Sequence, residues 1–245
     1  MALPRGPERL QKLIANAGLC SRRQAEQLLR SGQVQVNGLP ARLGDKADPS
    51  CDRINVAGEA LAAPPPPLLL LLNKPIGVLC SCRDPQGRPT VLDLLPPELR
   101  HHRGLHPVGR LDADSHGALL LSNQGALTLT LTHPRYGHRK TYRVWVQGHP
   151  TATSLARWRR GLPLDDQPSQ PVAVRILDSS ASATCLQVVM GEGRNRQIRR
   201  TAAALGHPVR DLQRLAIGPL GLGSLRQGEW RRLDRGEWSQ LVQPS

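Results

Sequence analysis

The stretch "GRLDADSHGALLLSNQGAL", residues 109–127, sets an acidic residue, Asp112, directly after an Arg-Leu pair. Glycines stand on both sides of it, and the apolar run that follows is typical of a buried strand. We therefore expect Asp112 to lie on a loop held against a sheet, where reactive groups are often found. The residues alone do not decide between Asp112 and Asp114, or exclude that both only form turn hydrogen bonds.

The segments around this loop predict an α+β domain. "LLLLLNKPIGVL" at 68–79 indicates a buried strand and a turn, while "KTYRVWVQG" at 140–148 and "ATCLQVVMGEG" at 183–193 alternate like strands. "NRQIRRTAAALGH" at 195–207 has helical spacing, and the stretch after Gly125 fits a helix or a strand. Strands in hairpin-like succession favour a mostly antiparallel or mixed sheet.

The N-terminal part predicts two short helices and a hairpin. Apolar residues between positions 10 and 17 fall at helical spacing, and Gly18 ends that helix. Ser21 is placed to cap a second helix, and the alternating segment 33–36 runs into the turn dipeptide Asn37-Gly38. We expect a small domain at 8–61, a stiff Pro-rich linker "AAPPPP" at 62–67, and a larger domain at 68–245.

The charge balance favours a polyanionic partner. The 245 residues include 33 Lys and Arg against 19 Asp and Glu, which gives a formal charge of +14 and a pI near 11.0. One face of the two N-terminal helices could meet a phosphate backbone, although a solvated face is the commoner fate of such a cluster; its residues are Arg9, Lys12, Arg22, Arg23 and Arg30.

Other classes of protein fit the sequence poorly. The first ten residues do not have the apolar core of a secretory signal, and the leucine run at 68–72 is shorter than the ~20 residues that span a bilayer. Five cysteines form no disulfide framework. We therefore expect a cytoplasmic protein that has reduced thiols and no membrane partner.

Two further stretches carry residues suited to RNA chemistry. In the strand at 140–148, Lys140 and Tyr142 share a face, and Tyr142 either packs in the core or stacks on a nucleobase. Between a Gly-rich turn and a helix, four arginines form a candidate phosphate cradle that could also supply a cation to the acid; they are Arg194, Arg196, Arg199 and Arg200.

The stretch "RLQKLIANAGLCSRRQAEQLLRSGQVQVNG" resembles the S-four domain, a small RNA-binding module, and the match covers residues 8 to about 61. "GRLDADSHGALLLSNQG", the Lys-Thr-Tyr triplet at 140–142 and "EGRNRQIRR" together resemble the pseudouridine synthases, specifically the RsuA-type branch that modifies ribosomal RNA. Ser115, Ala118 and Gln124 stand where this branch usually has Thr, Leu and Asp.

The resemblance implies that Asp112 is the catalytic aspartate, that Tyr142 stacks on the target base, and that Arg199 pairs with the aspartate. It implies isomerisation of uridine to pseudouridine with no cofactor and no metal. The "GRNR" spelling at 193–196 resembles members that act on 23S more than those that act on 16S rRNA. The aspartate acts either as a nucleophile or by removing the 2′ proton.

The expected partner is ribosomal RNA or a ribosomal assembly intermediate, and we expect a monomer. Beyond the three catalytic residues, the candidate RNA contacts in the larger domain are Arg110, Lys140, Arg194, Arg196 and Arg200. Two alternatives stay open. The chain could be a non-catalytic RNA-binding or ribosome-assembly protein, or a metal-dependent nuclease that uses Asp112, Asp114 and His116.

Overall fold

Two units make up the chain in this computed structural model, which describes residues 6–100, 104–133 and 136–242. The first unit contains the described residues up to Leu68, together with residues from the segments 96–106 and 122–125. The second unit contains the remainder. No helix in the described ranges is long and apolar enough to cross a membrane.

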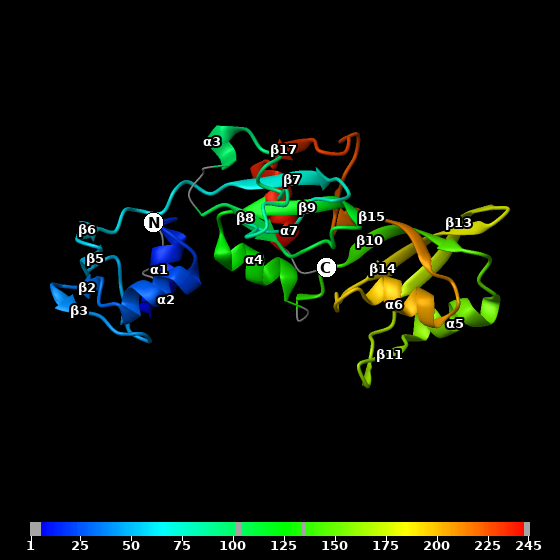
Figure 1. Cartoon of the computed structure of the whole chain (residues 1–245), viewed down its shortest axis with the longest axis horizontal. Coiled ribbons are helices and arrows are strands. Elements are labelled where there is room, and N and C mark those ends of the chain that lie inside the picture. Colours follow the sequence, from blue (N-terminus) through cyan, green and yellow to red (C-terminus); the bar gives the residue numbers. More distant parts are fainter. Residues whose placement is uncertain (1–5, 101–103, 134–135, 243–245) are drawn as a thin grey trace. The chain divides into compact units, whose positions relative to one another are not determined.

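The first unit has the predicted helix-helix-hairpin order (Figure 1). Ser21 caps α2 in a capping box, because its hydroxyl accepts from Gln24 N at 3.3 Å while Gln24 Oε1 accepts from Ser21 N at 3.0 Å. Asn37 and Gly38 both have positive φ, as a two-residue hairpin turn requires. The elements are β1 (Glu8–Arg9), α1 (Leu10–Asn16), α2 (Arg22–Arg30), β2 (Val34–Val36), β3 (Leu39–Pro40), β4 (Lys46–Ala47), β5 (Ile54–Val56), β6 (Glu59–Ala60) and α3 (Pro97–Arg100).

Hydrogen bonds within this unit fix the end of the Pro-rich segment. Asn123 Oδ1 accepts from Leu68 N at 2.9 Å, and Asn123 Nδ2 donates to Pro66 O at 2.8 Å. Ser122 Oγ donates to Leu68 O at 2.9 Å. Ser122 and Asn123 therefore hold the backbone at the end of the Pro-rich segment.

The second unit is built on a mixed sheet, which confirms the predicted fold class. Among the described residues, nine strands join it in the order β13-β14-β10-β15-β9-β7-β17, with β16 beside β15 and β8 beside β9. Most pairs are antiparallel, whereas β15 and β9 are parallel. The strands are β7 (Leu69–Lys74), β8 (His106–Val108), β9 (His116–Ser122), β10 (Lys140–Gln147), β13 (Ala173–Ser180), β14 (Ala183–Met190), β15 (Val209–Ile217), β16 (Leu220–Gly221) and β17 (Trp230–Arg232).

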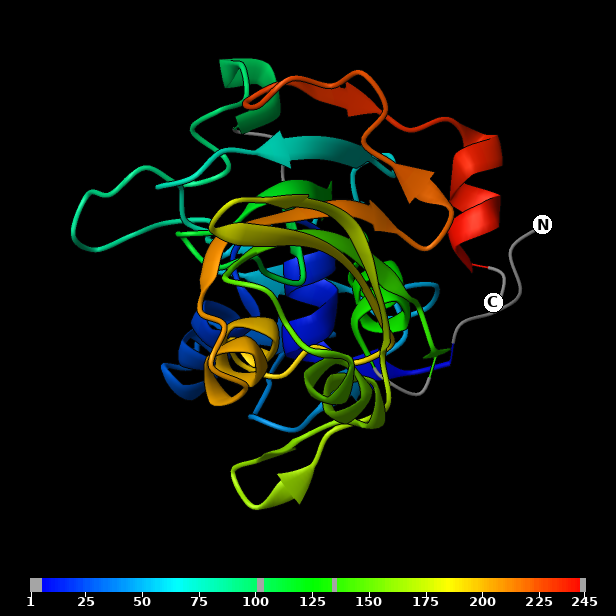
Figure 2. The same ribbon diagram turned by 90° about the vertical axis from the view of Figure 1, so that its right-hand side faces the viewer.

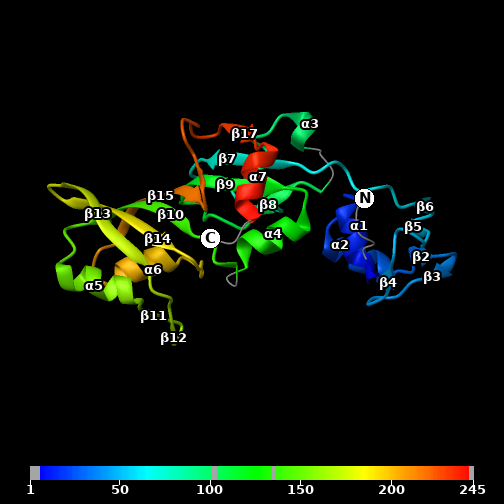
Figure 3. The same cartoon turned by 180° about the vertical axis from the view of Figure 1, so that it is seen from behind.

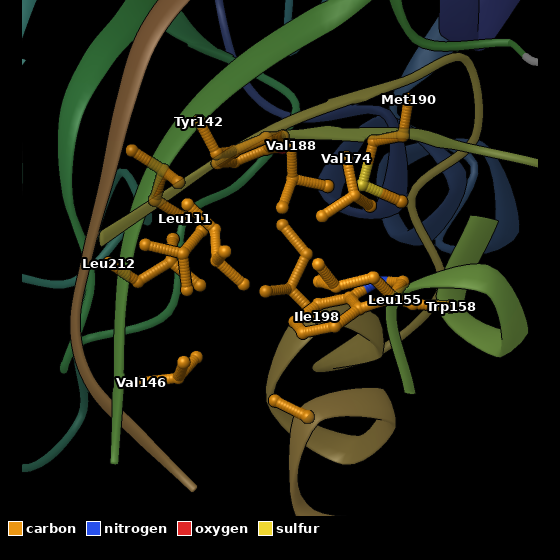
Figure 4. Packing of buried hydrophobic residues seen from close by; sticks show 13 residues of the cluster. Leu111, Tyr142, Val146, Leu155, Trp158, Val174, Val188, Met190, Ile198 and Leu212 are labelled. Carbon is orange, nitrogen blue, oxygen red and sulfur yellow. The ribbon is translucent and has the colours of Figure 1, made fainter. Parts of the chain in front are cut away.

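Helices cover the sheet over two apolar clusters. In the first, Leu155 and Trp158 of α5 (Ala152–Arg160) and Ile198 of α6 (Gln197–Ala204) pack against Tyr142 and Val188 of the sheet (Figure 4). In the second, α4 (Gly125–Thr132) and α7 (Arg235–Val242) cover β7 and β9, as Figure 3 shows. A small hairpin of β11 (Pro163–Leu164) and β12 (Gln167–Pro168) follows α5.

The stretch whose type the pattern left open is the helix α4. Its alternating Leu and Thr residues suit a strand, yet Leu127 and Leu131, four residues apart, bury their side chains together in the second cluster. Tertiary packing thus decides between two periodicities that the local sequence supports about equally.

Candidate active site

Asp112 lies on a loop between β8 and β9, as predicted; we call residues 109–115 the aspartate loop. Contacts with the segment after β7 hold the loop's backbone on one side. Leu111 N donates to Cys80 Sγ at 3.2 Å, and Gly77 N donates to Ala113 O at 2.8 Å. Ser115 N closes a turn onto Asp112 O at 3.1 Å. Backbone hydrogen bonds on both sides of Asp112 therefore fix its position in the loop.

Two arginines hold the other side of the aspartate loop. Arg196 binds the Asp114 carboxylate through two hydrogen bonds of 2.7 and 3.2 Å. Arg199 Nη2 donates to Asp114 O at 2.7 Å and to Ser115 Oγ at 3.0 Å. The hydrogen bond from Arg196 lowers the pKa of Asp114 below its usual value.

The expected pairing of Arg199 with Asp112 differs from the geometry in this structure. The ion pair of Asp112 comes from Arg196, with 3.5 Å between Arg196 Nη1 and Asp112 Oδ2. Arg199 instead lies 3.4 Å from Asp114, measured from Nε to Oδ2. Arg196 precedes α6 with a left-handed backbone, at φ 49°, whereas Arg199 lies inside the helix. Sequence spacing did not show which of the two reaches Asp112.

Tyr142 and Lys140 stand at the start of β10 and face the same pocket as Asp112. Tyr142 is buried among Leu111, Val188 and Ile198 (Figure 4), so it packs in the core and also lines the pocket. Burial lowers the pKa of Lys140, and the charge of Arg214 lowers it further. The two uses that the sequence offered for Tyr142 are thus compatible.

A pocket of about 420 Å³ joins these residues. Its acidic side chain is Asp112, and its walls include apolar groups such as Met190 and Leu212. The basic side chains that line it are Arg110, Lys140, Arg194, Arg196, Arg199 and Arg214. This excess of cations around one carboxylate suits a polyanionic substrate whose reacting group meets the acid.

Two of the four clustered arginines are committed to the β11–β12 hairpin (Figure 2) rather than free for phosphate. Arg194 donates to the backbone oxygens of Gln167, at 3.0 Å, and Pro168, at 2.5 Å. Arg200 binds Asp165 through hydrogen bonds of 2.6 and 2.9 Å. The sequence grouped the four because they are adjacent, but the fold divides them between two regions.

Two buried cations were not among the predicted site residues. Lys74 is fully buried, its Nζ donates to the carbonyl oxygens of Pro75 and Val78 at 2.8 Å each, and burial lowers its pKa. Arg214 on β15 is only 5% exposed and lines the pocket. Strand alternation was the available signal, since Arg214 shares a face with the buried Leu212.

Other side chains engage the three residues of the metal-nuclease hypothesis: Arg196 pairs with both Asp112 and Asp114, and Asp211 contacts His116. Asp114 pairs with Arg196, and His116 Nε2 lies 2.9 Å from Asp211 Oδ1. Within the part of the chain that the structure describes, no group of three or more His, Cys, Asp or Glu side chains is arranged to hold a metal ion.

In the first unit, Arg22, Arg23 and Arg30 of α2 are exposed. Lys12 is engaged with Glu8 in an ion pair of 2.7 Å, and Arg9 donates to the carbonyl oxygen of Gly44. The candidate RNA contacts of this unit therefore divide into exposed arginines on α2 and side chains with partners on or beside α1.

Comparison with known proteins matches both units to families. The model of the family described as RNA pseudouridylate synthase matches residues 68–204, and that of the S4 domain matches residues 8–54.

Whole-chain relatives agree with these matches. An uncharacterized RNA pseudouridine synthase of Aquifex aeolicus is 39% identical over 237 residues, covering 95% of this chain and 93% of that protein. The ribosomal large subunit pseudouridine synthase B of Bacillus subtilis is 39% identical over 237 residues, covering 96% and 95%. A crystal structure of a pseudouridylate synthase aligns with a TM-score of 0.71 at 32% identity, covering 96% of this chain and 99% of that one.

Proposed function

This chain belongs to the RNA pseudouridylate synthase family and carries an S4 domain, and from that premise we propose that it isomerises a specific uridine of large-subunit ribosomal RNA to pseudouridine. The observation that carries the proposal is the pocket that Asp112 lines together with Tyr142 and, among the described residues, six basic side chains. Support for the large subunit comes from the relative in Bacillus subtilis and from the "GRNR" spelling at 193–196.

The reaction breaks the bond between C1′ of the ribose and N1 of uracil and forms a new bond from C1′ to C5. The C5 proton is lost and N1 takes up a proton, so atoms and electrons balance without an oxidant or reductant. Asp112 acts at the sugar, either by bonding to C1′ or by removing the 2′ proton. We therefore propose that the chemistry needs no cofactor.

The surroundings of Asp112 suit this task. A uridine in folded RNA must leave its stack, at a cost of a few kcal/mol, before a carboxylate reaches its sugar. Stacking on Tyr142 and contacts between phosphates and Arg110, Lys140 or Arg196 offset that cost. Arg199 holds the aspartate loop through Asp114 and Ser115, so we assign it to positioning Asp112.

The finer organisation is proposed on the same basis. Residues 8–61 form the RNA-binding domain, 62–67 the linker and 68–245 the catalytic domain. The protein acts as a monomer in the cytoplasm, and its substrate is ribosomal RNA or a ribosomal assembly intermediate. The exposed arginines of α2 supply affinity to this RNA.

The test is incubation of the purified protein with unmodified 16S and 23S rRNA, without added metal or cofactor, followed by chemical mapping of pseudouridine. We expect one new site in 23S rRNA that is absent when Asp112→Asn replaces the wild type. A site in 16S rRNA alone would contradict the subunit assignment, and equal conversion by the variant would contradict the role of Asp112.

A further inference from the structure

Arg214 is a buried arginine whose guanidinium is fixed by backbone groups. Its Nε donates to Ala118 O at 2.6 Å, and its Nη1 lies 3.5 Å from Arg110 O. The strand that carries it pairs in parallel with β9, where Gly117 lies opposite. Arg110 belongs to the aspartate loop and Ala118 to β9 just after it, so Arg214 has a set position relative to Asp112.

The remaining nitrogen of this group has no hydrogen-bond partner among the residues that the structure describes. Arg214 Nη2 is buried and makes no hydrogen bond to any residue in the described ranges. An unsatisfied donor on a buried charged group is costly, and folded proteins rarely keep one without a reason. Because Arg214 lines the same pocket as Asp112 and Tyr142, a substrate atom is the natural acceptor.

The electrostatics of this part of the pocket call for an anionic acceptor. The hydrogen-bond contacts of Arg214 are to carbonyl oxygens, which do not neutralise its charge. Lys140 lines the same pocket, and the charge of Arg214 lowers its pKa, as expected for two cations in proximity. An oxygen that gains negative charge during the reaction would be stabilised by both.

We propose that Arg214 is a catalytic residue that donates a hydrogen bond from Nη2 to a carbonyl oxygen of uracil as the base departs. This inference rests on the proposed function, because the departing anion is formed in that reaction. When the C1′–N1 bond breaks, its electron pair goes to the base, and the negative charge spreads over N1, O2 and O4. A rigid, buried donor stabilises such developing charge better than it stabilises the neutral base.

A phosphate is the less suitable acceptor for this donor. Arg110 and Arg196 also line the pocket and are exposed. A phosphate of the RNA backbone can contact them while it stays in solvent. Arg214 is only 5% exposed, so an anion must enter the pocket completely to reach it. The flipped base enters most deeply in the proposed mechanism.

The test uses free bases, so it does not depend on which RNA is modified. Binding of 5-nitrouracil, an anion at mildly alkaline pH, is compared by calorimetry with binding of neutral uracil at the same pH. We expect the wild type to prefer the anion by about tenfold or more, because the charged guanidinium then donates to an oxygen that carries negative charge instead of to a neutral oxygen. Arg214→Gln should remove most of that preference.

Matched variants separate this role from a structural one. Arg210→Gln removes the same charge from the same strand at an exposed position, and it should keep the preference. Arg214→Lys keeps the charge without the planar fork and should retain part of the preference, which also guards against misfolding of Arg214→Gln. Circular dichroism and thermal unfolding check the fold of each variant.

Equal affinity of the wild type for both bases would overturn the proposal, as would a preference that survives Arg214→Gln. If Arg214→Gln instead weakens uridine 5′-monophosphate relative to uridine and leaves 5-nitrouracil binding unchanged, Arg214 holds a phosphate and the proposal is also wrong. If the protein forms no pseudouridine in the rRNA assay, that result counts against the proposed function alone, because the binding of free bases is measured independently of that assay.

Discussion

The aspartate loop and the β11–β12 hairpin each receive two arginines from one short segment, yet the two regions use them differently. Arg196 and Arg199 bind the aspartate loop beside the pocket, whereas Arg194 and Arg200 bind the hairpin. Among the described residues, Asp114 takes most of the contacts in the loop, and Asp112 has a single ion pair of 3.5 Å. Arginines that are close together in the sequence are thus not all available to bind phosphate.

The difference also bears on the two carboxylates of the loop. Asp114 is fixed by Arg196 and Arg199 and holds the loop in shape. Asp112 lines the pocket, and its side chain is 36% exposed, so it can meet a substrate. One acid of the pair is therefore structural and the other is available for chemistry.

The largest effect is expected for Asp112→Asn. The amide keeps the size of the side chain but cannot act as a nucleophile or base, so pseudouridine formation should fall at least about 10³-fold. Affinity for the RNA, measured by filter binding, should stay within a few-fold of the wild type. Retained activity in this variant would mean that the reacting group lies elsewhere.

Gly117→Ala should reduce the stability of the second unit most. Gly117 has φ of 109°, and an added Cβ would lie 2.2 Å from Arg214 O, which is backbone and cannot move aside cheaply. Overpacking and left-handed strain together should cost about 3 kcal/mol or more. Urea denaturation of the variant and the wild type measures the loss, and an unchanged midpoint would show that β9 and β15 separate easily here.

Arg196→Gln and Arg200→Gln form a matched pair, because Arg196 binds the aspartate loop and Arg200 binds the β11–β12 hairpin. Arg196→Gln removes the ion pair of Asp112 and the anchor of Asp114, so we expect about a tenfold loss of activity. Arg200→Gln frees Asp165 at the hairpin and should change activity less than about twofold. Single-turnover rates on one RNA fragment compare them, and the reverse order would show that the hairpin takes part in catalysis.

The smallest effect is the pH dependence of the Asp114 ion pair. Arg196 holds the pKa of Asp114 below its value in the unfolded chain, so the stabilisation is present above that unfolded value and is lost as pH falls through the lower folded one. Because the Asp114 side chain is 46% exposed, we expect less than about 1 kcal/mol. The difference in unfolding free energy between wild type and Asp114→Asn should shrink in acid; growth of that difference in acid would reverse the assigned sign.

Sequence patterns predicted the elements whose causes are local. The capping box of Ser21, the turn at Asn37-Gly38 and the alternation around Tyr142 are interactions between neighbours in the chain or between the faces of one strand. The partners of the arginines were not predictable in this way, because Arg200 meets a residue 35 positions away and Arg196 one 82 positions away. Such pairings depend on loop geometry rather than on residue spacing.

The most direct test of the account sets Asp112→Asn against Asp114→Asn in one assay. Single-turnover formation of pseudouridine in the same 23S rRNA fragment is measured for both variants and the wild type. We expect Asp114→Asn to stay within about tenfold of the wild type and Asp112→Asn to form no measurable product. Product from Asp112→Asn together with loss of activity in Asp114→Asn would contradict this expectation.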